Sequence, residues 1–200
     1  MGYGIDEIQR IRKILSEKLD PGRYEHTLGV SFTCAALAMA YGEDIDKAEM
    51  AGLLHDCAKR FPESVLIEKC KKNGVYLTDS ELASPAVIHA KYGRYMALKK
   101  YGITDEDVLN AISYHTTGRA HMSELEKIVY IADYIEPRRF KAKNLPEIRK
   151  LAFKDLNECM LRILEDTVKY LKGKHSNIAS DTLEAYEYFK DLKSKDQEKR

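Results

Sequence analysis

The chain has 200 residues, which is enough for one domain with a sizeable hydrophobic core. Its 33 basic and 32 acidic residues give a formal net charge of +1, so no overall positive field indicates nucleic acid or a membrane surface as a partner. Recognition of any anion must therefore be local. No apolar run approaches the roughly 18 residues that a membrane span needs, and residues 1–14 contain no apolar signal core, so we expect a cytoplasmic protein.

Helical periodicity runs through the first half of the chain, and we find no convincing alternation of the kind that marks a strand. Gly42 and the pair Asn73-Gly74 are typical helix stops. Asp46 has capping-box spacing with Glu49, so it is predicted to begin the third helix. The segments expected to be helical are residues 5–19, 24–41, 46–59, 62–72, a short helix from Thr78, and 85–101.

The second half is predicted to be helical as well. Thr104 and Ser123 each precede an acidic residue at capping-box spacing, and Pro137 ends the second of these two helices. The remaining expected segments are a long helix over 146–171, a last helix capped by Asp181 with Glu184, and a charged tail over 193–200. We therefore expect one all-α domain over residues 1–200, with its core at about 6–190.

The four cysteines are far apart in the sequence and lie mostly at apolar positions of the predicted helices. They have no C-x-x-C spacing, which argues against a thiolate-bound structural metal. We expect buried free thiols in a reducing compartment at Cys34, Cys57, Cys70 and Cys159.

Asp133 is a charged residue on the apolar face of a predicted helix. Leu125 and Val129 lead to it in steps of four residues, so its carboxylate should enter the core. An unpaired ionised Asp there would cost several kcal/mol or would have to take up a proton. The pattern therefore predicts a positively charged partner for Asp133.

Histidines occupy comparable inward positions on other predicted helices. Taken singly, each is better explained as a hydrogen-bonded core histidine than as a metal ligand. Their joint occurrence favours a shared cation, and imidazole with carboxylate suits iron, manganese or zinc. The candidate set is His26, His55, Asp56, His89, His115 and Asp133.

The spacing of these residues on helices resembles the HD superfamily of metal-dependent phosphohydrolases. Four segments are similar to those of its YqeK-like branch, the symmetrical bis(5'-nucleosyl)-tetraphosphatases, and the resemblance covers about residues 6–190. The segments are Arg23-Tyr24-Glu25-His26-Thr27-Leu28-Gly29-Val30, Leu53-Leu54-His55-Asp56-Cys57-Ala58-Lys59, His115-Thr116-Thr117-Gly118 and Ile131-Ala132-Asp133-Tyr134-Ile135-Glu136-Pro137-Arg138.

The resemblance implies that water cleaves diadenosine tetraphosphate into two ADP molecules with iron as the cofactor, as one ion or two, with manganese or another divalent cation as substitutes. It implies metal ligands at His26, His55, Asp56 and Asp133. In related enzymes the counterparts of His89 and His115 hold a second metal bridged through Asp56, and contact with phosphate is the alternative role for them in this branch. Asp56, Lys59, His89 and His115 are the expected catalytic residues.

Cationic and polar residues beside these ligands are expected to bind the substrate. A helix continuing past His55 would place Lys59 one turn further along the same face, and Arg138 offers the fork geometry that suits phosphate. Arg60, Arg119, Arg139 and His121 are expected to be surface residues. The full set of expected substrate contacts is His26, Asp56, Lys59, His89, His115, Thr116, Asp133, Arg138, His175 and Ile178, although the family's proline is missing from the Lys174–Thr182 turn.

Two other functions fit the same sequence. One is a different HD-type phosphohydrolase, either a mononucleotide nucleotidase or a cyclic-nucleotide phosphodiesterase. The other is a non-catalytic module that binds a nucleotide, although such a module has no need of a metal-activated water. The sequence leaves the oligomeric state open, with a homodimer as one alternative.

Overall fold

Side-chain caps fix where several of the helices begin. Asp20 accepts a hydrogen bond from Arg23 N directly before Pro21, and Ser123 forms the predicted capping box with Glu126. The computed structural model describes residues 3–140 and 142–198, with side chains as far as residue 195. Its helices are α1 (Ile5–Lys18), α2 (Pro21–Tyr41), α3 (Ile45–Leu54), α4 (Glu63–Lys72), α5 (Asp79–Leu82), η1 (Pro85–Val87), α6 (Ile88–Lys100), α7 (Glu106–Tyr114), α8 (Glu124–Ile135), α9 (Leu145–Ala152), α10 (Leu156–Gly173) and α11 (Ser180–Glu198).

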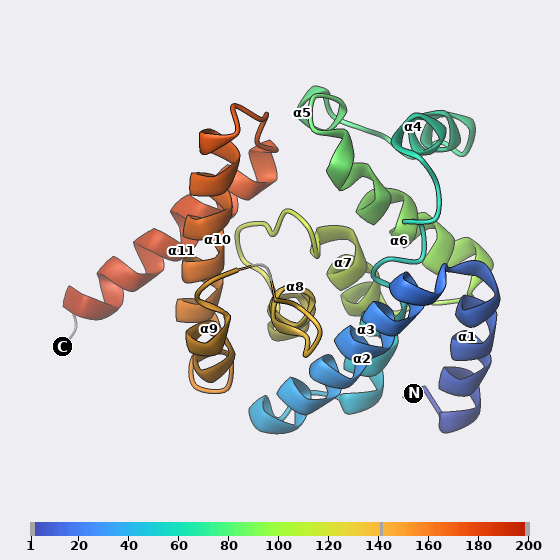
Figure 1. Ribbon diagram of the computed structural model, residues 1–200, viewed down its shortest axis with the longest axis horizontal. Coiled ribbons are helices and arrows are strands. Elements are labelled where there is room, and N and C mark those ends of the chain that lie inside the picture. The colour runs from blue at the N-terminus through green and yellow to red at the C-terminus, as the bar shows by residue number, and fades with distance from the viewer. Residues whose placement is uncertain (1–2, 141, 199–200) are drawn as a thin grey trace.

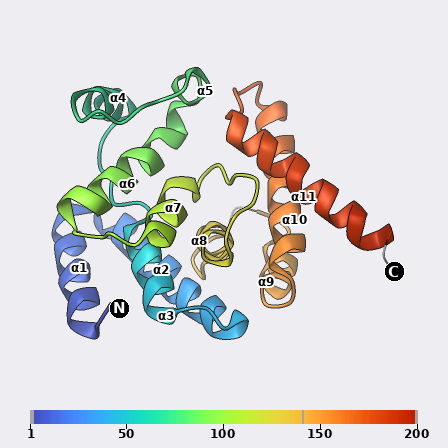
Figure 2. The same cartoon turned by 180° about the vertical axis from the view of Figure 1, so that it is seen from behind.

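Helix α8 lies at the centre of the arrangement. It packs against α2, α3 and α7 on one side and against α9 and α10 on the other, with α11 outermost (Figure 1 and, from behind, Figure 2). One hydrophobic cluster extends from Ile8 on α1 to Phe189 on α11. The described residues contain no strand, so the predicted all-α fold is confirmed as a single helical domain. No helix in this part of the chain is both long and apolar enough to cross a membrane.

Helix α2 begins at Pro21, three residues before the predicted start at Tyr24, and two predicted caps were wrong by one or two residues. The cap of α3 is Asp44, which accepts from Lys47 N, and not Asp46. The cap of α7 is Asp105 rather than Thr104. In both cases an acidic residue beside the predicted cap has the correct extended backbone, which capping-box spacing alone does not reveal.

The predicted end of the third helix was wrong as well. Helix α3 stops at Leu54, with His55 as its C-cap, and residues 55–60 form consecutive turns. Cys57 N donates to Leu54 O and Lys59 N donates to Asp56 O, which are three-residue turns rather than helical bonds. This early end places the His-Asp pair at a helix terminus and not inside a helix.

The predicted long helix over 146–171 is in fact two helices. Helix α9 ends at Ala152, and the Asp155 side chain accepts from Glu158 N to begin α10. Ile148, Ala152 and Leu156 are all buried, so the apolar spacing continues across the break and hides it from a sequence pattern.

The C-terminal prediction was partly wrong. Helix α11 begins at Ser180, so Asp181 lies inside its first turn and is not the cap. The expected charged tail continues the helix as far as Glu198, and Lys193 Nζ lies 2.7 Å from Glu158 Oε1 of α10. Residues 199 and 200 of that tail lie outside the described residues.

The four cysteines are free and buried, as the sequence predicted. Burial raises the pKa of Cys57 and Cys159 to about 12 and that of Cys70 to about 11. Burial also raises the pKa of Cys34. These thiols stay protonated at neutral pH and pack as small apolar side chains.

Gly52 allows α2 and α3 to cross closely enough to share a site. A Cβ atom at Gly52 would lie 2.8 Å from Ser31 Cα and 3.1 Å from Ser31 N. Backbone atoms cannot move aside as a flexible side chain could, so any larger residue would separate the helices that carry His26 and His55.

We predict that Gly52→Ala lowers the free energy of unfolding by about 1–3 kcal/mol, because it overpacks this helix crossing. Urea denaturation followed by circular dichroism measures the change. Gly173→Ala is the matched control, since a Cβ atom there meets nothing within 4 Å. Equal stability of the two variants would contradict the close-approach role of Gly52.

Candidate metal centre

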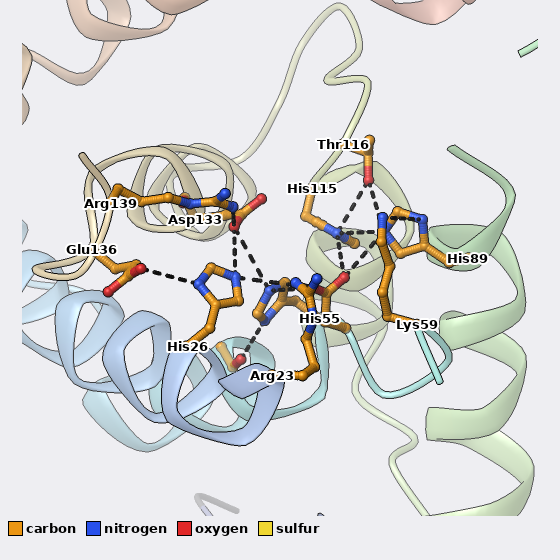
Figure 3. Close-up of polar contacts among 12 residues, drawn as sticks. Arg23, His26, His55, Lys59, His89, His115, Thr116, Asp133, Glu136 and Arg139 are labelled. Carbon is orange, nitrogen blue, oxygen red and sulfur yellow. Dashed lines mark hydrogen bonds and ion pairs between the residues drawn. The ribbon is translucent and has the colours of Figure 1, made fainter. Parts of the chain in front are cut away.

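The six residues predicted to share a cation lie together although five helices deliver them. His26 lies in the second turn of α2, His55 and Asp56 follow α3, and His89 lies at the start of α6. His115 is the C-cap of α7, and Asp133 lies in the last turn of α8. Figure 3 shows the side chains of the four histidines and Asp133 pointing toward one another, with the His26 and Asp133 pair on one side of His55 and His89 with His115 on the other.

Asp56 lies between the two groups of histidines. Its Oδ1 atom is 3.1 Å from His89 Nε2 and 3.5 Å from His115 Nε2. Its Oδ2 atom is 3.5 Å from His55 Nε2 and 3.9 Å from His26 Nε2. One carboxylate therefore faces two imidazole pairs, each through a different oxygen.

Hydrogen bonds on the far side of three rings fix which nitrogen faces the cluster. The Nδ1 atoms of His55, His89 and His115 lie 2.7, 2.7 and 2.8 Å from the backbone carbonyl oxygens three residues earlier. A carbonyl oxygen can only accept, so each Nδ1 donates and each neutral ring presents the lone pair of Nε2 to the cluster.

The result is a set of hydrogen-bond acceptors with too few donors. In the described part of the chain, His26 Nε2 and His55 Nε2 are buried without an aligned hydrogen-bond partner, even though His26 Nε2 is 3.0 Å from Asp133 Oδ1. The Nε2 atoms of His89 and His115 lie only 3.2 Å apart. Nitrogen and carboxylate donors that converge in this way fit a divalent metal ion.

Both carboxylates are ionised in this environment. Burial alone would raise the pKa of Asp56, but the electrostatic interaction with His55 and the hydrogen-bonding contacts with His115, His55 and His89 hold it well below its usual range. Burial also opposes ionisation of Asp133, but His26, whose Nε2 atom lies 3.0 Å from Asp133 Oδ1, lowers the pKa of Asp133 strongly. The pattern prediction that Asp133 needs a positive partner agrees with this geometry.

Lys59 and Thr116 lie at the His89 and His115 side of the cluster. The i+4 helical placement of Lys59 was wrong, since α3 ends before it, yet the turn brings its Nζ atom to 3.4 Å from His89 Nε2. Thr116 Oγ1 is 3.1 Å from His115 Nε2. A cation and a hydroxyl group thus stand beside the histidines that the sequence grouped with them.

Two arginines touch the candidate ligands although sequence reasoning did not select them. Arg23 Nη1 lies 2.6 Å from Asp56 Oδ2, and Arg139 Nη2 lies 2.5 Å from Asp133 Oδ1. Arg139 is exposed, as expected, but its contact with Asp133 places it at the site, from which the sequence analysis had left it out. A signal existed for Arg23, which precedes His26 by three residues on the same helix face. Arg139 offered none, because it follows Pro137 outside any periodic segment.

The other residues expected at the surface do not reach the cluster. Arg119 pairs with Glu126 at 2.7 Å, whereas Arg60 and His121 are exposed. Arg138 is 69% exposed and pairs with Glu25 at 2.7 Å. Its position is therefore the rim of the site, and not its floor.

A pocket of about 840 Å³ opens beside the cluster. His26, His115, Thr116 and Asp133 line it together with Arg23, Arg138 and Arg139. It continues between α8 and α10, where its wall is less polar and is formed by Tyr130, Tyr134, Leu145, Ile163 and Thr167. A volume of this size suits a small organic ligand, since such pockets measure about 300–1,000 Å³.

His175 and Ile178 are not brought to this pocket. His175 is exposed, and the turn that contains both residues packs against the segment after α5. Asn177 Nδ2 donates to Ala83 O at 2.8 Å, and Ser180 N donates to Ser80 Oγ at 2.7 Å. The structure therefore does not place these two predicted contacts beside the cluster of histidines and aspartates.

The helical fold and the His-Asp cluster indicate a class of metal-binding helical domains, and sequence comparison finds the same class. The HD domain family matches residues 23–138, which include all six clustered residues and more than half of the chain. The chain therefore belongs to the HD domain family, as its motifs predicted.

Similar proteins extend over nearly the whole chain. "Bis(5'-nucleosyl)-tetraphosphatase, symmetrical" of Bacillus subtilis is 39% identical over 87% of this chain and 92% of that protein. The protein of the same name from Staphylococcus aureus is 34% identical over 91% of this chain and 94% of its own length. A crystal structure described as a predicted HD superfamily hydrolase involved in NAD metabolism, from Clostridium acetobutylicum, is 44% identical, with a TM-score of 0.89 over 96% of this chain and 100% of that one.

We predict that Mn²⁺ raises the melting temperature of metal-free protein, because an ion that binds only the folded state stabilises it. At 100 times the dissociation constant the gain is about 2.7 kcal/mol. Asp56→Ala should abolish both this shift and most of the metal binding, whereas the exposed Asp191→Ala should keep them. Scanning calorimetry across a Mn²⁺ series measures the shift, and a full shift in Asp56→Ala would contradict the site.

Proposed function

We propose that this chain hydrolyses diadenosine tetraphosphate into two ADP molecules. The observation that carries the proposal is an ionised carboxylate and imidazole cluster that opens into a pocket with three arginines, Arg23, Arg138 and Arg139. The near full-length similarity to proteins named symmetrical bis(5'-nucleosyl)-tetraphosphatases supports the choice of substrate.

Iron is the cofactor that we propose, held by His26, His55, Asp56 and Asp133. Manganese or another divalent cation suits the same nitrogen and oxygen donors. His89 and His115 either complete a second site through the other oxygen of Asp56 or contact phosphate directly. A divalent cation in such a site supplies activation of water and neutralisation of phosphate charge.

The cationic side chains are proposed to hold the phosphate chain. Arg23 and Arg139 each present a guanidinium beside a ligand carboxylate, so phosphate bound at the cluster lies within their reach. Lys59 approaches from the opposite side, next to His89. Since the net charge of the chain is only +1, this local group provides the anion recognition that overall charge does not.

One ADP half of the substrate is proposed to occupy the pocket between α8 and α10. Tyr130, Tyr134 and Ile163 form an apolar wall there that suits a nucleoside. This location replaces the Lys174–Thr182 turn that the sequence suggested, since that turn does not line the pocket. The other ADP half then lies outside the pocket as the leaving group.

We also propose that the protein acts in the cytoplasm. Four free buried thiols, without a disulfide among the described residues, suit a reducing compartment. Whether the active form is a monomer or a homodimer stays a prediction for measurement in solution.

The first test separates metal binding from phosphate binding. Arg23→Ala, Lys59→Ala and Arg138→Ala should each keep metal content near wild type but lose about 2–4 kcal/mol of transition-state stabilisation, because each removes one charge-assisted donor. Steady-state kinetics with metal analysis measure both quantities. Arg10→Ala, which removes an exposed arginine of α1, is the control. Wild-type kinetics in all three variants would contradict the proposal that these side chains bind phosphate.

The second test asks which bond breaks. Reaction of diadenosine tetraphosphate in heavy-oxygen water should give two ADP, with the label on a terminal phosphate, because the inner phosphorus lies over the cluster when one ADP half fills the pocket. Mass spectrometry of the products measures this outcome. Formation of ATP and AMP would mean attack at an outer phosphorus, and the chain would then be a different HD-type phosphohydrolase.

A further inference from the structure

His26 is oriented differently from the other three histidines of the cluster. His55 and His115 are C-caps, and helix ends leave backbone carbonyls free to accept from Nδ1. His89 uses the carbonyl of Ala86, in the short turn before α6. His26 lies inside α2, where the preceding carbonyls accept from the helix itself. Its Nδ1 atom therefore needs an acceptor from elsewhere in the fold.

Glu136 provides that acceptor. Its Oε1 atom lies 3.1 Å from His26 Nδ1, and Figure 3 shows the carboxylate on the side of the ring away from the cluster. Only 2% of the Glu136 side chain is exposed. Its Oε2 atom accepts from Arg138 N at 2.7 Å. Both carboxylate oxygens are thus engaged, one by a ring nitrogen and one by a fixed backbone donor.

The backbone of Glu136 is held in place as well. Arg149 of α9 donates from Nη2 to Glu136 O at 2.8 Å and from Nε to Ile135 O at 2.9 Å. A third bond joins Arg149 Nη2 to Arg139 O at 2.9 Å. The turn after α8 therefore cannot swing away from His26 without breaking several hydrogen bonds.

Gly29 makes the room that this carboxylate occupies. A Cβ atom at Gly29 would lie 2.7 Å from Glu136 Oε2. Glycine inside a helix costs about 0.5–1 kcal/mol relative to alanine, and Gly29 has no left-handed backbone that would require it. The space for Glu136 is a sufficient reason for a glycine at this position.

We propose that Glu136 is a positioning residue for the metal. Its carboxylate holds a proton of His26 on Nδ1, which leaves Nε2, 3.0 Å from Asp133 Oδ1, as the ring atom that would bind a cation, and its charge makes the ring a stronger donor to that cation. Nothing in this role requires contact with substrate. The inference rests on the proposed metal site but does not depend on which substrate is cleaved.

The structure predicts an unusual order of effects for two variants. In Glu136→Gln, Arg138 N still demands an acceptor, so the amide oxygen turns to it and the amide NH₂ group faces His26 Nδ1. The ring must then carry its proton on Nε2, which points an N–H group at the metal site. Glu136→Ala leaves the ring free to take either form. The isosteric variant should therefore bind metal more weakly than the truncated one, whereas a role in packing alone predicts the reverse.

The experiment measures Mn²⁺ affinity by chelator competition and the His26 ring tautomer by nitrogen NMR of metal-free protein. We expect Glu136→Gln to bind Mn²⁺ about 10–100-fold more weakly than wild type, with His26 Nδ1 no longer protonated and a proton on Nε2. Glu136→Ala should lose less. Gly29→Ala, which removes no polar group but displaces the carboxylate, should also weaken Mn²⁺ binding, and Gly173→Ala should not.

Wild-type affinity in Glu136→Gln, or tighter binding there than in Glu136→Ala, would overturn the proposal. So would an unchanged His26 tautomer in Glu136→Gln. If that variant does not fold by circular dichroism, Gly29→Ala decides the question alone, and wild-type affinity there counts against the role. Failure of the wild-type protein to bind Mn²⁺ would instead contradict the proposed metal site, while the tautomer measurement would still test Glu136.

Discussion

The structure depends on one constraint, which is that buried carboxylate and imidazole groups from several helices lie close together. Two ionised carboxylates and the Nε2 atoms of four imidazoles converge where five helices meet, and a cation among them would satisfy all of these buried polar groups together. The position of each helix relative to the others is therefore tightly constrained. The close crossing of α2 and α3 and the buried turn after α8 both meet that demand.

The C-terminal ends of two helices both position cluster histidines and orient their rings. Ending α3 at Leu54 and α7 at Tyr114 delivers His55 and His115 to the cluster and also leaves free carbonyls to orient their rings. An extra helical turn at either place would consume those carbonyls in backbone hydrogen bonding. The boundary of a secondary-structure element is thus part of the chemistry of the site.

Sequence alone predicted the fold class and the gathering of the cluster, because both follow from periodicity. Asp133 on an apolar stripe had to find a positive partner, and it did. Features outside any period were missed. Arg139 lies in an irregular turn, and the break before Asp155 is masked by apolar residues that keep their spacing on both sides. Glu136 lay within a recognised motif, but only the fold shows that it faces His26 and not solvent.

The HD family match ends at residue 138, yet the pocket continues across the domain to α10. Every clustered residue comes from the matched part, whereas Leu145, Ile163 and Thr167 on the pocket wall come from helices beyond it. Replacements on that wall can reshape the space that we propose for a nucleoside without changing any residue of the cluster. Mutations beyond residue 138 could in this way change which ligand fits the pocket, while the histidines and aspartates of the cluster stay the same.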